Sequence, residues 1–180
     1  MPRYVALFRG INVGNAKRIA MADLRKILES LGYENVATLL NSGNAIFDAK
    51  AEPEAKHAQR IHDAVLKKLK VDALVVVKSA ADVAGMIAGN KLGKIATNPS
   101  LLLVAMTNDA KGWKVLETIA GASETAKAVH LGKHALYAWC PEGTLKSRAG
   151  VALLTKLADS GTTRNWATLE KIHEMLREIR

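Results

Sequence analysis

The order of short apolar runs and amphipathic stretches is the feature that most constrains the fold of this chain. Over residues 4–77 the pattern predicts strand, helix, strand, strand, helix, strand. The strand runs are short and apolar, whereas the helical stretches repeat apolar residues every three or four positions. This order is that of the split βαβ, or ferredoxin-like, unit. We expect strands at residues 4–8, 36–40, 45–47 and 73–77, and helices at 21–31 and 53–69.

The second half of the chain begins with the same pattern and ends on a helix. A strand is expected at 101–106, a helix at 113–119, a hairpin at 126–140, and helices at 150–158 and 166–179. We therefore expect an α+β fold of two ferredoxin-like subdomains in tandem, with mostly antiparallel sheets. The expected parts are a first subdomain at 1–79, a connector with a short helix at 80–100, and a second α+β subdomain at 101–180 that ends in a helix.

Composition excludes several classes of protein. With 180 residues, of which 49% are hydrophobic, the chain is long enough to bury a core without disulfides. Its longest strongly apolar stretch, residues 101–106, is too short to span a bilayer. Cys140 is the single cysteine, so the chain can form no internal disulfide. These features, and the lack of a signal-peptide pattern, predict a cytoplasmic protein that does not associate with membranes.

Charge points to an anionic partner. Lys and Arg outnumber Asp and Glu by 26 to 17, which gives a formal net charge of +9. The excess is spread along the chain, and its densest run, residues 67–70, suits the end of a helix. A nucleic acid is one possible partner, but no helix-turn-helix, zinc-finger or RNA-recognition motif accompanies the charge.

Two polar segments are expected to form one site. Residues 9–15 join the first strand to the first helix, and residues 41–44 form a hairpin turn. In a split βαβ sheet both connections lie at the same end of the strands, so we expect them side by side. The Arg9 guanidinium suits a carboxylate or phosphate, and glycine lets the backbone approach a ligand closely. The alternative is that both segments are only tight connections.

A third polar segment, residues 161–166, precedes the last helix. Thr162 or Thr163 is expected to cap that helix, which would leave free backbone N–H groups beside Arg164 as an anion site. The alternative is a capped helix with Trp166 packed in the core. The sequence does not decide whether Arg164 joins the first two segments.

These observations predict a protein that binds an anionic small ligand, nucleotide-like or phosphate-bearing. Nucleic-acid binding through diffuse positive charge, and an interaction module without a ligand, stay open as alternatives. No catalytic dyad or metal motif is recognised, so enzymatic activity is uncertain and any cofactor is unknown. The residues expected to bind the ligand are Arg9, Gly10, Asn12, Gly14, Ser42, Gly43, Asn44, Arg164 and Asn165.

The same three segments carry a family resemblance. Residues 4–14, 42–47 and 162–168 resemble the "LLRGINVGG", "QSGNVVF" and "TTRNWNT" segments of the bacterial family called domain of unknown function 1697. The resemblance implies an α+β fold of two ferredoxin-like subdomains and implies no activity. The chain departs from the family pattern at Asn15, Asn41 and Ala167.

Overall fold

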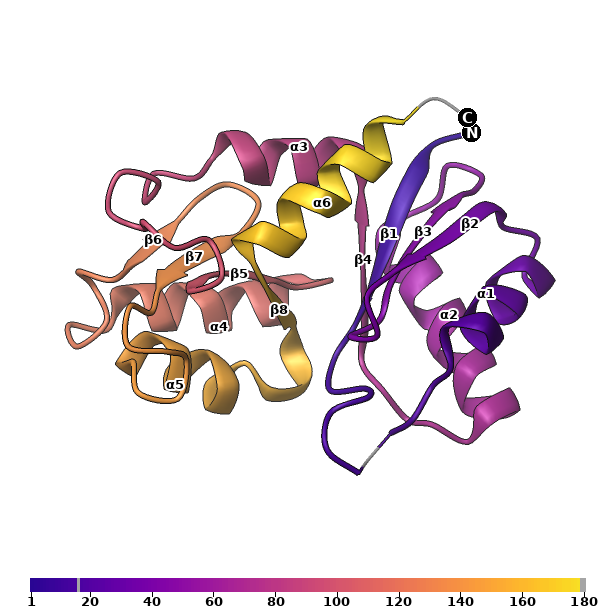
Figure 1. The fold of residues 1–180 in the computed structure, drawn as a ribbon, viewed down its shortest axis with the longest axis horizontal. Coiled ribbons are helices and arrows are strands. Elements are labelled where there is room, and N and C mark those ends of the chain that lie inside the picture. The colour runs from indigo at the N-terminus through magenta and orange to yellow at the C-terminus, as the bar shows by residue number, and fades with distance from the viewer. Residues whose placement is uncertain (16, 179–180) are drawn as a thin grey trace. The chain divides into compact units, whose positions relative to one another are not determined.

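The computed structural model describes residues 1–15 and 17–178. Figure 1 labels its helices and strands and colours them from the N-terminus to the C-terminus. The chain divides into two units: residues 1–80 together with those from 174 onward, and residues 81–173. The boundary expected after residue 79 lies next to this division. The helix that was expected in a connector belongs to the second unit.

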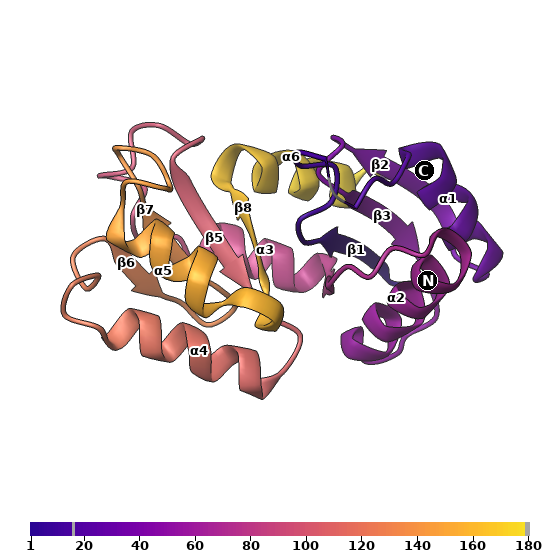
Figure 2. The same cartoon turned by 90° about the horizontal axis from the view of Figure 1, so that it is seen from below.

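The first unit contains one four-stranded sheet and two helices. Its elements are β1 (Arg3–Phe8), α1 (Met21–Ser30), β2 (Glu34–Leu39), β3 (Asn44–Asp48), α2 (Glu54–Leu69) and β4 (Val75–Ser79). The strand order is β2-β3-β1-β4, and all neighbouring strands are antiparallel. This is the order of a split βαβ unit, as the sequence predicts. The helices α1 and α2 cover the same face of the sheet (Figure 2).

An aromatic cluster packs in the core of the first unit. The rings of Tyr33 and Phe47 stack with their centroids 4.4 Å apart, and the Tyr4 and His57 rings are 4.7 Å apart. His57 is only 1% exposed. Its Nε2 lies 3.3 Å from the Lys50 carbonyl oxygen, which can only accept a hydrogen bond, so Nδ1 accepts the hydrogen bond from the Tyr33 hydroxyl at 2.9 Å. This arrangement gives both ring nitrogens of a neutral His57 a partner.

We expect His57 to make the protein less stable as the pH falls below about 6.5. Burial lowers the pKa of His57. Between this lowered pKa and the ordinary one, the unfolded chain binds more protons than the folded chain, so acid favours unfolding. His62 acts in the opposite direction, because hydrogen bonds to Asp72 and Asp63 raise its pKa. Urea unfolding of a His62→Gln variant at pH values of about 7.5 and 5.5 measures the effect of His57.

A second substitution isolates the contribution of His57. In the His62→Gln background, His57→Gln keeps a side-chain oxygen that can accept from Tyr33 but does not titrate. It is expected to lose less stability between the two pH values than the parent does. Equal losses in the two variants would assign the acid sensitivity to other groups.

The second unit repeats the arrangement of the first. Its elements are α3 (Ala80–Ala88), β5 (Leu102–Met106), α4 (Ala110–Gly121), β6 (Val129–Leu131), β7 (Leu136–Trp139), α5 (Arg148–Lys156), a 3-10 helix (Ala158–Ser160), β8 (Thr162–Asn165) and α6 (Trp166–Arg177). The sheet has the order β6-β7-β5-β8, again with antiparallel neighbours. On one face α4 and α5 pack against the sheet, and on the other the Tyr137 hydroxyl donates to the Met86 carbonyl of α3 at 2.5 Å. Figure 1 shows α3 and the start of α6 on the face opposite α4 and α5.

The expected cap at Thr162 or Thr163 is wrong. Both residues belong to β8, where Thr163 pairs with Ala105 and Arg164 pairs with Val104 of β5. Threonine is β-branched and suits a strand, and the backbone groups here are bonded in the sheet. The cap of α6 is Asn165, whose Oδ1 accepts from the Thr168 N–H at 2.9 Å. Both halves therefore follow the order β-α-β-β-α-β and then a helix. Among the described residues, no helix is both long and apolar enough to cross a membrane.

Candidate functional site

The connection after β1 and the turn between β2 and β3 lie side by side, as the topology predicts. The backbone N–H of Phe8 donates to the Gly43 carbonyl at 2.9 Å. The side-chain Nδ2 of Asn12 donates to the Asn41 carbonyl at 2.7 Å. Two segments about 30 residues apart in the sequence thus form one surface at the end of the first sheet.

Gly43 makes the close approach of these two segments possible. Its φ is +85°, and a Cβ built on it would lie 2.5 Å from Cδ1 of Ile11 and 2.8 Å from Cβ of Phe8. Ile11 is itself buried. Gly10 and Gly14 also have positive φ values, but the space around their Cα atoms is open. Gly43 is therefore required by both its backbone conformation and its packing.

Asn12 and Asn44 hold the two segments in shape. Asn12 donates from Nδ2 to the Ile19 carbonyl at 2.8 Å, and its Oδ1 accepts from the Ile19 N–H at 2.9 Å. Asn44 is 0% exposed, and its Nδ2 donates to the Leu39 carbonyl at 2.8 Å and lies 3.2 Å from the Ser42 hydroxyl. These contacts give both amides a structural role, whereas the sequence predicts that they orient a ligand.

A depression of about 300 Å³ opens beside these segments, at the start of α1. The first turn of a helix carries N–H groups that have no partner within the helix. The residue that precedes α1, Ala20, offers no side-chain acceptor, and no described residue accepts from the N–H of Met21 or Ala22. This end of a helix favours an anion. The depression is lined by Asn12, Arg18, Ile19, Ala20 and Asn41.

The cation at this depression is Arg18, which the sequence analysis missed. Arg18 is exposed, and its guanidinium donates to the Gly14 carbonyl. Arg9, the expected anion ligand, is half-buried at the base of the connection, where its backbone N–H donates to the Leu74 carbonyl at 2.9 Å. The signal that could have identified Arg18 is a pair of cations, Lys17 and Arg18, directly before a helix that has no Ser, Thr, Asp or Asn to cap it.

A comparison with known protein families shows the family to which the chain belongs. Residues 1–137 match the family described as "Protein of unknown function (DUF1697)". The chain belongs to the DUF1697 family. The match contains the first two of the three polar segments and all the residues that line the depression. No curated protein is similar enough to this member of the family to add to the comparison.

A solved structure shares the fold of this DUF1697 member. It is described as "The structure of conserved bacterial protein SP0830 from Streptococcus pneumoniae", and the two chains are 24% identical. The likeness has a TM-score of 0.79 and covers 98% of this chain and 99% of the other. At this identity the likeness shows a shared fold alone, and that fold spans nearly all of both chains.

Arg164 and Asn165 of this DUF1697 member lie in the second unit. Arg164 is 9% exposed, and its Nη1 donates to the Thr162 hydroxyl at 3.1 Å and the Thr163 carbonyl at 2.8 Å. Burial lowers the pKa of Arg164 to about 10, because water no longer stabilises its charge. Arg164 is thus a buried strand residue, and Asn165 is the cap of α6.

Two histidines and the cysteine of the second unit also have defined surroundings. The Nδ1 of His134 lies 3.0 Å from Oδ1 of Asp82, whereas His130 stacks on the ring of Tyr137. Burial raises the pKa of the Cys140 thiol, so this cysteine stays protonated at neutral pH. Within residues 1–15 and 17–178, His, Cys, Asp and Glu form no cluster of three or more that could hold a metal ion.

Proposed function

We propose that this protein is a cytoplasmic binding protein for an anionic small ligand, nucleotide-like or phosphate-bearing. The observation that carries the proposal is the depression of about 300 Å³ at the uncapped start of α1. Its volume is at the lower end of the range for small-molecule pockets. A phosphate or carboxylate group there accepts hydrogen bonds from the N–H groups of Met21 and Ala22.

Arg18 supplies the positive charge in this proposal. A guanidinium offers several N–H donors in a plane and pairs well with phosphate oxygens. Arg9, Gly10, Gly14 and Ser42 are retained as the proposed contacts of the remainder of the ligand. Asn12, Gly43 and Asn44 keep the two segments together, and the proposal does not depend on Arg164 or Asn165.

We expect Ala20→Asp to stabilise the protein and to abolish ligand binding. The new carboxylate caps α1, which adds about 0.5–2 kcal/mol to the free energy of unfolding. It also occupies the N–H groups that the ligand needs and repels its negative charge. NMR titrations with inorganic phosphate, AMP and ATP measure binding through the amide signals of Met21 and Ala22, and urea unfolding measures stability.

Two further variants test the role of charge. Arg18→Ala is expected to weaken binding by about tenfold, since it removes a charge-assisted hydrogen bond. Lys26→Ala removes an exposed cation from the middle of α1 and should leave the affinity unchanged. The proposal fails if none of the three probes shifts the amides of α1, or if Ala20→Asp binds them as the wild type does.

Nucleic-acid binding through the net charge of +9 gives a different result. It predicts affinity for a labelled duplex that falls steeply with added salt. Arg18→Ala and Lys26→Ala would then weaken binding to a similar degree, because each removes one cation. Ala20→Asp would change duplex affinity only slightly.

A further inference from the structure

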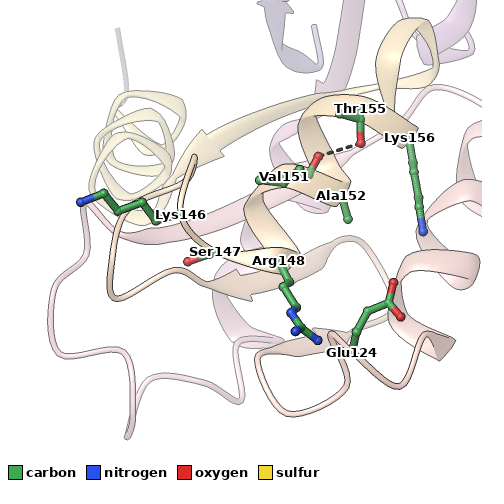
Figure 3. Close-up of a pocket in the computed structure, with 8 residues that line it drawn as sticks. All are labelled: Glu124, Lys146, Ser147, Arg148, Val151, Ala152, Thr155 and Lys156. Atoms are coloured by element: carbon green, nitrogen blue, oxygen red, sulfur yellow. Dashed lines mark hydrogen bonds between the residues drawn. The ribbon is translucent and has the colours of Figure 1, made fainter.

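A second concave surface lies in the second unit, on the outer side of α5. It is a groove of about 390 Å³ that runs between α5 and the segment containing Glu124 (Figure 3). We call it the α5 groove, and it is lined by Glu124, Lys146, Ser147, Arg148, Val151, Ala152, Thr155 and Lys156. None of these residues belongs to the segments that form the depression at α1.

The lining residues of α5 form one stripe along the helix. Val151, Ala152 and Thr155 follow Arg148 by three, four and seven positions, so their side chains lie on one face. From Arg148 to Lys156 the stripe extends for about 12 Å. Figure 3 shows that Arg148 and Lys156 both point toward Glu124, whereas Lys146 points away. The groove is thus long enough for about two turns of a bound helix.

The charged side chains of the α5 groove have no partners in the part of the chain that the structure describes. Among the described residues, Glu124, Arg148 and Lys156 form no ion pair or side-chain hydrogen bond. Beside them lie exposed aliphatic side chains: Val151 is 40% exposed, Leu154 is 42% exposed and Leu145 is 79% exposed. Three cations, one carboxylate and the exposed side chain of Val151 therefore line the same groove, and Leu145 and Leu154 are exposed at neighbouring positions of the sequence.

We propose that the α5 groove binds an acidic, amphipathic segment of a partner protein. Carboxylates of that segment pair with Arg148 and Lys156, and its aliphatic side chains cover Val151. A nucleic acid fits less well, since the lining has no aromatic side chain on which a base could stack. A second copy of this chain also fits less well, because its net charge is +9.

The test uses a defined probe, a short fluorescent helical peptide made of Glu and Leu with the Leu residues on one face. Fluorescence anisotropy with the full-length protein should show saturable binding. A scrambled peptide of the same composition should bind more weakly, because its aliphatic groups no longer share one face. Arg148→Glu combined with Lys156→Glu is expected to weaken peptide binding by about tenfold or more, since attraction becomes repulsion.

Two controls separate the groove from general charge. Lys171→Glu reverses an exposed cation on α6, which lies across the sheet from α5 in Figure 1, and should change affinity by less than about twofold. Val151→Ser should weaken the peptide complex without affecting the binding of single-stranded DNA. All altered side chains are at the surface, so melting curves should remain close to that of the wild type.

Three results would overturn the proposal. The first is no saturable binding of the Glu–Leu peptide to the wild type. The second is equal peptide affinity in the wild type and the double variant. The third is that only single-stranded DNA binds in a manner that depends on Arg148 and Lys156, which would assign the groove to nucleic acid.

Discussion

Gly43→Ala is expected to lower the free energy of unfolding by roughly 3 kcal/mol, because two costs add. The φ of +85° is a left-handed conformation that costs an alanine about 1–2 kcal/mol. The added Cβ would also lie 2.5 Å from Ile11 and 2.8 Å from Phe8, and such overpacking typically costs about 1–3 kcal/mol. Denaturant unfolding followed by circular dichroism measures the loss.

Gly10→Ala is the matched control for this substitution. Gly10 has a φ of +66°, but a Cβ there meets nothing within 4 Å. Only the conformational cost applies, so the expected loss is about 1–2 kcal/mol. Equal losses in the two variants would show that contact with Ile11 and Phe8 is not what requires glycine at position 43. A larger loss at Gly43, with a shift of the Asn12 amide signals, would support the packing argument.

Phe47→Ala is expected to have the largest effect on stability, a loss of about 3–5 kcal/mol. Phe47 is 0% exposed, and its ring lies 4.4 Å from that of Tyr33, 5.7 Å from that of Tyr4 and 5.9 Å from that of His57. Alanine leaves a cavity among these rings that a close-packed core cannot fill. Urea unfolding measures the loss if the variant folds, and thermal unfolding detects the variant if it is only marginally stable.

Phe47→Leu provides the comparison for this second substitution. Leucine fills most of the volume but loses the stacking with Tyr33, which contributes about 0.5–1.5 kcal/mol beyond the buried area. The leucine variant should therefore be clearly more stable than the alanine variant. If Phe47→Ala costs less than about 1 kcal/mol, the aromatic cluster does not hold the first unit together.

The sequence predicted the parts of the fold that depend on local pattern. Apolar periodicity in residues 53–69 places a helix that the structure shows at Glu54–Leu69. The positions of the two polar segments followed from topology alone, since the chain leaves β1 at the end of the sheet where β2 turns into β3. Such predictions succeed when each element is long enough to show its period.

The parts that the sequence missed depend on tertiary contacts. Residues 162–165 contain Arg and Asn and have no apolar alternation, so their strand pairing with β5 is not visible in the pattern. The sequence predicts Arg9 as an anion ligand and does not single out Arg18, which the fold exposes beside the start of α1. Which of several cations faces a concavity is decided by the path of the loop, and the polar sequence between β1 and α1 does not encode that path in a recognisable way.

The contribution of the C-terminal residues to the first unit has a consequence for synthesis of the protein. Arg3 pairs with Asp48 at 2.8 Å and also donates to the backbone carbonyl of Glu178, so both ends of the described chain complete the same unit. On the ribosome, residues 1–80 emerge long before residue 178. At the usual pace of translation this interval lasts roughly 5–20 seconds. The nascent first unit must therefore persist in an incomplete form while the whole of the second unit is made.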